Sequence, residues 1–164
     1  MTSDAALLHS AERVGEALLT RGWTVTTAES CTGGWIAKVL TDVAGSSQWF
    51  ARGFVTYSND AKSDMLGVSD ETLARHGAVS EQVVLAMAAG AARAARAECA
   101  VAVSGIAGPG GAVPGKPVGS VWIAWQSPAG AQTQLFVFAG DREAVRRQSV
   151  VAALQGLLAE LRGD

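Results

Sequence analysis

Apolar residues recur every three or four positions over residues 3–21, so that Leu7, Ala11, Val14 and Leu18 share one face of a predicted helix. Gly22 follows at the position where helices commonly end. Residues 23–27 then alternate as in a strand, and a tight turn over residues 28–34 leads into a second predicted helix over residues 35–43. Residues 49–57 again have the pattern of a strand.

Serine residues mark the predicted helix starts in the middle of the chain. Ser58 and Ser69 are placed to cap two short helices that Gly67 and Gly77 end, and Ser80 is placed to cap a longer, alanine-rich helix that reaches about residue 97. The small residues of this longer helix include Ala86, Ala89, Gly90 and Ala94. They allow close packing on the protein's own sheet or on a partner helix, and the sequence leaves both interpretations open.

The second half of the chain predicts a buried strand, a loop, a hairpin and a helix. Residues 99–103 are entirely apolar, as in a central strand, and a Gly/Pro-rich loop over residues 104–119 follows. Residues 120–126 and 132–138 are predicted to pair around residues 128–130, and Asp141 caps a last helix that runs to about residue 161. Helices and strands alternate first and a hairpin follows, so the predicted fold is α/β, a three-layer α/β/α sandwich with a mixed sheet in a single domain over residues 1–164.

Composition limits the class of protein. Of 164 residues, 49% are hydrophobic and 17% charged, which indicates a folded core. No apolar run approaches the roughly 20 residues of a membrane span, the N-terminus lacks the pattern of a signal peptide, and Cys31 and Cys99 cannot form a disulfide framework. We therefore expect a cytoplasmic protein without membrane contact. The net charge of −2 argues against a nucleic-acid partner. His9 and His76 lack further ligands at suitable spacings, so we expect neither a metal ion nor a cofactor.

Two loops rich in Gly and Ser follow predicted strands, where α/β sheets bind their ligands. The first places Ser30 on a sharp turn from a strand into a helix, followed by amides that can hold a phosphate or a developing oxyanion. The neighbours of Ser30 are candidate substrate-binding residues: Glu29, Cys31, Thr32, Gly33 and Gly34. The local residues are equally compatible with an ordinary helix start capped by Ser30 or Thr32.

A nucleophilic serine needs a base, and no histidine lies in either loop. A neutral lysine can take the hydroxyl proton, and Lys62 lies in the first turns of the helix after Ser58, where the helix dipole favours an uncharged amine. Tyr57 is placed to relay the proton or to orient this amine. A solvated surface lysine is the alternative. Cys31 is the competing nucleophile, but without a histidine partner it is more typical of a packing residue.

The second loop leaves the predicted buried strand, and its amides can bind an anion or the substrate's carboxamide. Its candidate binding residues are Ser104, Gly105, Ala107 and Gly108. In the last helix, Arg142, Arg146 and Arg147 form the densest positive charge of the chain. The planar guanidinium group suits bidentate recognition of phosphate.

Together these segments closely resemble the nicotinamide-nucleotide amidase family, also known as the C-terminal domain of competence/damage-inducible protein CinA. The matching stretches span nearly the whole chain in order: TAESCTGGWIAKVLTDVAGSS, FVTYSNDAKSDMLGV, HGAVSEQVV, SGIAGPGG, KPVGSVW and GDREAVRRQ. In longer family members a molybdopterin-binding-like domain precedes this one, so the chain resembles the stand-alone form. The resemblance implies metal-independent deamidation of nicotinamide mononucleotide in pyridine-nucleotide salvage, by a homodimer or larger homo-oligomer.

Matched position by position, the family nucleophile falls on Ser30, with Tyr57 and Lys62 as its catalytic partners. The family's Gly-rich substrate loop falls on residues 104–111, and its arginine falls on Arg146 or Arg147, between which the sequence does not choose. A non-catalytic module of the same fold, which senses a nucleotide or binds a partner, is the alternative from another class. An amidase for another small amide is a second alternative. The joint presence of the three catalytic candidates favours the enzyme.

Overall fold

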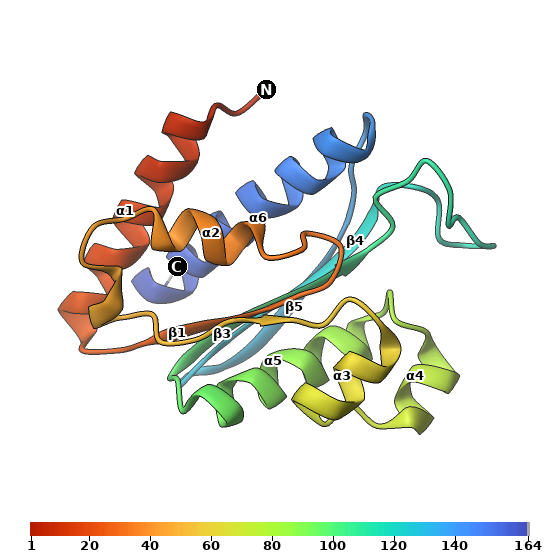
Figure 1. The fold of residues 1–164 in the computed structure, drawn as a ribbon, viewed down its shortest axis with the longest axis horizontal. Coiled ribbons are helices and arrows are strands. Elements are labelled where there is room, and N and C mark those ends of the chain that lie inside the picture. The colour runs from red at the N-terminus through yellow and green to blue at the C-terminus, as the bar shows by residue number, and fades with distance from the viewer. Residues whose placement is uncertain (164) are drawn as a thin grey trace.

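A computed structural model describes residues 1–163 and contains a five-stranded mixed sheet with helices on both faces (Figure 1). The strands are β1 (Val25–Glu29), β2 (Phe54–Val55), β3 (Cys99–Gly105), β4 (Ser120–Ser127) and β5 (Gly130–Val137). Their order is β2-β1-β3-β4-β5. β1 pairs in parallel with β2 and β3, whereas β4 pairs antiparallel with β3 and β5. The expected α/β fold with a mixed sheet is confirmed.

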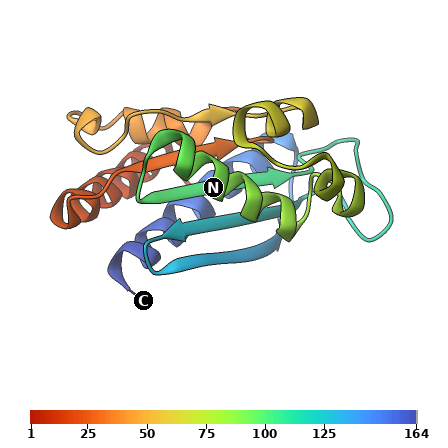
Figure 2. The same cartoon turned by 90° about the horizontal axis from the view of Figure 1, so that it is seen from below.

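The helices form a layer on each face of this sheet. One layer contains α1 (Asp4–Arg21), α2 (Trp35–Thr41) and α6 (Arg142–Arg162), and the other contains α3 (Asn59–Leu66), α4 (Asp70–His76) and α5 (Glu81–Ala95) (Figure 1). Figure 2 shows α5 lying across the second face. Along β3, Val101 and Val103 belong to the core beneath α1 and α6, whereas Ala100 and Ala102 belong to the core beneath α5. None of the six helices within residues 1–163 combines the length and apolar character that crossing a bilayer requires.

The predicted helix caps are confirmed. The hydroxyl oxygens of Ser58, Ser69 and Ser80 each accept a hydrogen bond from the backbone N–H three residues later, and the Asp141 carboxylate accepts one in the same way. Such caps satisfy backbone donors that a helix start otherwise leaves unpaired. The cap at Ser58 fixes the start of α3 and makes Lys62 the fourth residue of that helix.

The predicted boundaries are furthest from the structure for the first two strands. The other three strands differ by one or two residues at one end or both, and β3 continues through residues 104 and 105, which were predicted to lie in the loop. β1 begins at Val25 and continues to Glu29, with all five residues buried, so residues 28 and 29 belong to the strand and not to the turn. Of the strand predicted over residues 49–57, only Phe54–Val55 pairs, together with an isolated bridge from Phe50 to Val25. Trp49 is buried instead, and its ring packs against Gly15 of α1.

The small residues of α5 are used mainly inside the protein. Gly90 lies against the backbone of Leu66 in α3 so closely that a Cβ would collide with it. Ala88 and Ala91 are fully buried against the sheet. Of the other small residues singled out in the sequence, Ala86 and Ala89 are half-buried and Ala94 is exposed. Packing within the chain therefore accounts for Gly90 and does not account for Ala94.

Four strands point in the same direction. β2 and β3 run parallel to β1, and β5 is antiparallel to β4, which is itself antiparallel to β3. The carboxyl ends of β1, β2, β3 and β5 therefore lie at one edge of the sheet, where ligands of α/β proteins commonly bind. The first residues after these strands gather there, as does the start of α6 at Arg142.

Candidate active site

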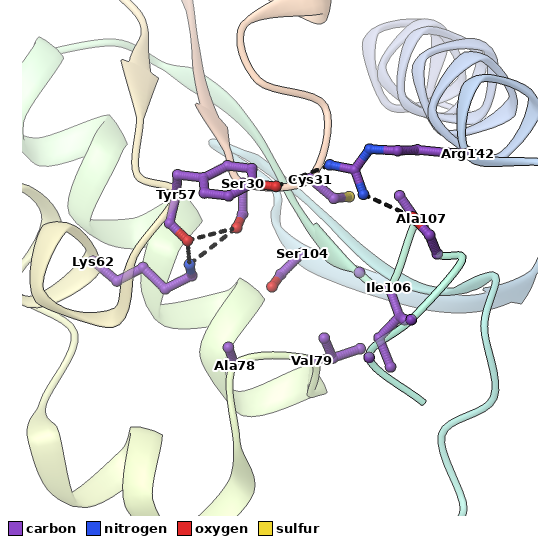
Figure 3. A pocket seen from close by; sticks show the side chains of 14 residues that line it. Ser30, Cys31, Tyr57, Lys62, Ala78, Val79, Ser104, Ile106, Ala107 and Arg142 are labelled. Carbon is purple, nitrogen blue, oxygen red and sulfur yellow. Dashed lines mark hydrogen bonds between the residues drawn. The ribbon is translucent and has the colours of Figure 1, made fainter. Parts of the chain in front are cut away.

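A pocket of about 280 Å³ lies at this edge of the sheet (Figure 3). Its volume is near the lower end of small-molecule sites, roughly 300–1,000 Å³. It brings together eight of the residues expected from the sequence: Ser30, Cys31, Tyr57, Lys62, Ser104, Gly105, Ala107 and Gly108.

Ser30 and Lys62 meet in the pocket, with their Oγ and Nζ atoms 3.0 Å apart (Figure 3). Ser30 directly follows β1, and its N–H donates to the carbonyl of Val103 in β3, which fixes the serine against the central strand. Lys62 reaches the serine from α3, and only 1% of its surface is exposed. The topology thus joins a candidate nucleophile and base that lie 32 positions apart in the sequence.

Two backbone carbonyls complete the surroundings of the lysine amine. Nζ of Lys62 is 2.8 Å from the carbonyl oxygen of Thr56 and 3.2 Å from that of Tyr57. An ammonium group can donate to both carbonyls and to the Ser30 oxygen. A neutral amine can donate to the two carbonyls and accept the Ser30 proton on its lone pair. The same three contacts therefore suit the lysine before and after it takes a proton.

Burial sets the charge state of this lysine. No ion pair within residues 1–163 includes Lys62. Moving an ammonium ion out of water is costly when no carboxylate compensates it, so burial lowers the pKa of Lys62 below its ordinary range. The alternative of a solvated surface lysine is wrong. A neutral fraction of the amine is available to act as a base.

Tyr57 contacts the pair through its backbone and not through its ring. Its carbonyl oxygen lies 3.2 Å from Nζ of Lys62 and 3.4 Å from Oγ of Ser30. Its phenol oxygen instead accepts a hydrogen bond of 3.0 Å from Arg142, and the residue is 60% exposed. Of the two roles that the sequence left open for Tyr57, relay of the proton and orientation of the amine, this arrangement favours orientation. The contact is made by the backbone carbonyl of Tyr57.

Cys31 lines the pocket beside Ser30 but is a poor rival nucleophile. The residue is buried, and burial raises the pKa of its thiol to about 11. Because the thiolate is the reactive form, little of this cysteine is nucleophilic near neutral pH. The geometry therefore favours Ser30.

Glu29 does not line the pocket, which corrects the expectation that it contacts the substrate. The residue is fully buried, and burial raises the pKa of its carboxyl group. Its carboxylate accepts hydrogen bonds from the Thr32 hydroxyl at 2.7 Å and from the N–H groups of Ile36 and Ala37 at 2.8 and 3.0 Å. Glu29 therefore satisfies the first amides of α2 and holds the turn that carries Ser30.

The other residues of that turn lead into the start of α2. Gly34 occupies the N-cap position, with a φ of 97° that favours glycine, and no side chain at that position caps the helix. The alternative of an ordinary helix start capped by Ser30 or Thr32 is therefore wrong. Thr32, Gly33 and Gly34 lie outside the pocket lining and shape the turn behind Ser30.

The arginines of α6 divide into two roles. Arg146 donates to the carbonyls of Cys31 and Thr32 at 3.0 and 3.2 Å, so it braces the Ser30 turn. Arg147 pairs with Asp4 at 2.6 Å. Neither lines the pocket, which corrects the expectation that one of them does. Arg142 lines it instead, because it is the first residue of α6 and lies at the carboxyl edge of the sheet.

The second loop forms the opposite wall and is fastened at two points. Arg142 donates to the carbonyl of Gly108 at 2.8 Å, and Lys116 donates to the carbonyl of His76 at 3.0 Å. Gly108 has a φ of 82°, and a Cβ there would collide with Val118. Ile106, Gly110 and Gly111 also line the pocket and belong to the substrate loop that the resemblance placed on residues 104–111. Two further lining residues, Ala78 and Val79, had no chemical signal in the sequence.

Metal ligands do not cluster in the part of the chain that the structure describes. No group of three or more His, Cys, Asp or Glu side chains within residues 1–163 is placed to hold an ion.

We expect turnover to survive prolonged treatment with a strong chelator, because a lysine base needs no metal-bound water. Ammonia release measured before and after chelation tests this. Activity lost on chelation and restored by one divalent ion would contradict it.

Comparison with known proteins adds to this geometry. The model of the CinA C-terminal domain family matches residues 8–161. The chain belongs to this family. Among its relatives, "Nicotinamide-nucleotide amidohydrolase PncC" of Escherichia coli (strain K12) is 62% identical over 156 residues, which cover 94% of each chain. The protein of that name from Pseudomonas putida is 55% identical over 148 residues, covering 90% of this chain and 92% of the relative.

The fold of the CinA C-terminal domain also agrees with a crystal structure. The CinA superfamily protein from Klebsiella pneumoniae is 44% identical and superposes with a TM-score of 0.93, covering 96% of this chain and 99% of the other. The resemblance on which the sequence analysis relied is therefore confirmed for the family and for the fold.

Proposed function

We propose that this protein hydrolyses the carboxamide of nicotinamide mononucleotide to nicotinic acid mononucleotide and ammonia. The contact of 3.0 Å between the Lys62 amine and the Ser30 hydroxyl carries the proposal, in a buried site where no carboxylate of residues 1–163 pairs with the lysine. The names of the PncC relatives, which are 55–62% identical to this chain, supply the substrate.

Acylation begins at Ser30. Lys62 takes the hydroxyl proton while the serine oxygen attacks the carboxamide carbon. The oxyanion needs donors that are not already engaged. Within residues 1–163, the backbone N–H groups of Cys31 and Ala107 are not paired, and both residues line the pocket from opposite walls. The amide that follows the nucleophile is also the usual first donor of an oxyanion hole in serine hydrolases.

Deacylation repeats the chemistry with water. After ammonia leaves, Lys62 is neutral again and takes a proton from a water molecule that attacks the ester. Collapse of this second tetrahedral intermediate returns the proton to Ser30 and releases the carboxylate product. The Thr56 and Tyr57 carbonyls hold the amine in place through both halves, because they accept hydrogen bonds in both charge states.

Arg142 is the residue that we assign to the phosphate. It is the arginine of the pocket lining, and its guanidinium group lies at the rim between Tyr57 and Gly108 (Figure 3). A guanidinium group offers five N–H donors in a planar fork, and its two present contacts leave capacity for phosphate oxygens.

Replacing Arg142 with alanine should raise KM for nicotinamide mononucleotide about ten- to a hundredfold, because a charge-assisted hydrogen bond contributes about 1.5–3 kcal/mol. Steady-state kinetics on the mononucleotide and on nicotinamide riboside, which lacks the phosphate, check this. Arg75→Ala, at an exposed surface pair, is the matched control. Equal losses on both substrates would mean that Arg142 only fastens the loop.

The proposed activity is tested by ammonia release from nicotinamide mononucleotide with the purified protein. Nicotinamide and other small amides serve as comparison substrates. Turnover of the mononucleotide well above the others is the expected result. Binding of the nucleotide without turnover would identify a non-catalytic module, and faster turnover of another amide would replace the substrate.

We also propose a cytoplasmic location and a homo-oligomeric state. Cys31 and Cys99 are both free, as is typical of proteins from reducing compartments. The family resemblance, not the packing of α5, supports the oligomer.

Static light scattering at working concentrations should give a mass of at least twice the 16.8 kDa of one chain. Dilution across a broad concentration range is the control, since a weak dimer dissociates by mass action. A mass of one chain at every concentration would exclude a homo-oligomer.

A further inference from the structure

Ser104 presents a buried hydroxyl that the mechanism above does not use. The residue is the sixth of β3 and only 1% exposed, yet it lines the pocket. Its oxygen points into the cavity, on the side of Ser30 and Lys62 (Figure 3). No hydrogen bond within residues 1–163 engages this hydroxyl. A hydroxyl that faces a cavity and has no protein partner is free to exchange hydrogen bonds with the molecule that occupies the cavity.

Cleavage of an amide needs an acid that protonates the leaving nitrogen, and Lys62 is held away from the far side of the pocket. The leaving nitrogen must be protonated before the C–N bond breaks, because an amide ion is too basic to depart. The proton available is the one that Lys62 has taken from Ser30. The lysine amine is held on the Ser30 side of the pocket by the Thr56 and Tyr57 carbonyls. A side chain that carries the proton from the amine to the nitrogen would meet this demand.

The other protic side chains in the pocket are unsuited to this transfer. The Tyr57 phenol lies at the exposed rim of the pocket, where its oxygen accepts a hydrogen bond from Arg142. The Cys31 thiol has a pKa that burial raises to about 11, and sulfur is a weak hydrogen-bond donor. A hydroxyl can accept one proton while it donates another, and Ser104 holds such a group free beside the catalytic pair.

We propose that Ser104 is a further catalytic residue, which passes the proton from Lys62 to the leaving nitrogen. In this step, the Lys62 ammonium gives a proton to the Ser104 oxygen while the Ser104 O–H gives its own proton to the nitrogen of the tetrahedral intermediate. The C–N bond then breaks, its electron pair stays on nitrogen, and ammonia leaves. Lys62 ends neutral and Ser104 ends as a hydroxyl, so neither residue is consumed. The inference rests on the proposed amidase function.

The test compares an amide with an ester of the same acid. Ser104→Ala should lower kcat for nicotinamide mononucleotide by about 10²–10⁴, the range of general acid–base contributions, with KM changed less than about threefold. For the methyl ester of nicotinic acid mononucleotide, kcat should fall less than about tenfold, because an alkoxide leaves with much less help from an acid. Ser104→Thr, which keeps the hydroxyl, should retain most of kcat for the amide.

Ser149→Ala is the matched control, because Ser149 is also a buried serine but its hydroxyl bonds within α6, outside the pocket lining. Equal losses on amide and ester, an effect on KM alone, or wild-type rates in Ser104→Ala would each overturn the proposal. A wild-type protein that hydrolyses the ester but releases no ammonia from the mononucleotide would overturn the amidase function and this inference with it. Full amide turnover by wild type with an unaffected Ser104→Ala variant would overturn the inference alone.

Discussion

Replacing Ser30 with alanine should lower kcat for nicotinamide mononucleotide by a factor on the order of 10⁴–10⁶, as loss of a covalent nucleophile does in serine hydrolases. The fold should persist, because the serine side chain is small and its loss removes one hydrogen bond to Lys62 and one long contact to Tyr57. We expect a change in the free energy of unfolding of about 0.5–2 kcal/mol. Single-turnover ammonia release and denaturant unfolding measure the two effects.

Cys31→Ala is the control for this variant, since Cys31 is the next residue along the same turn. It should keep most of the activity, because its buried thiol has a raised pKa and is a poor nucleophile. The opposite outcome, an active Ser30→Ala and an inactive Cys31→Ala, would move the nucleophile to sulfur.

Replacing Lys62 with arginine should lower kcat at least about a thousandfold, although the positive charge is kept. A guanidinium group stays protonated at any pH that the protein tolerates, so it cannot accept the serine proton. Lys62→Ala should be similarly inactive. If Lys62 only held a phosphate, Lys62→Arg would keep kcat and change KM, so kcat and KM measured separately distinguish the two roles.

The pH dependence of the wild type belongs to the same prediction. The amine is a base only when neutral, and burial lowers its pKa below the ordinary lysine value of about 10.4. The rate should therefore rise with pH through one deprotonation below that value and then level off. A rate that is flat from pH 6 to 10, or that rises only above the ordinary lysine pKa, would contradict a buried lysine base.

Local signals in the sequence predicted the helix starts well. At each of four helix starts, a side chain accepts a hydrogen bond from the amide three residues later: Ser58, Ser69, Ser80 and Asp141. Four consecutive residues of sequence are therefore enough to predict where such a helix begins. The start of α2 shows where such windows fail. Its first amides bond to Glu29, seven and eight positions earlier, which is not a spacing of the usual capping motifs.

The sequence predicted which residues form the catalytic group, but it did not predict which of their atoms contact one another. Sequence spacing places Tyr57 near Lys62, yet it cannot distinguish a contact by the phenol from a contact by the carbonyl, and the carbonyl is the one that meets the amine. The arginines illustrate a second limit. Arg142 and Arg146 are one helical turn apart, and only the position of α6 over the sheet decides which one faces the pocket.

The catalytic pair also joins the two helical layers of the protein. Ser30 leads into α2, which packs with α1 and α6, whereas Lys62 belongs to α3, which packs on α5 across the sheet. α3 has only eight residues, and short surface elements open with less free energy than global unfolding requires. Its detachment would withdraw the base while the sheet stays folded. We therefore expect heating to abolish activity, through opening of α3, at a lower temperature than the one that unfolds the sheet.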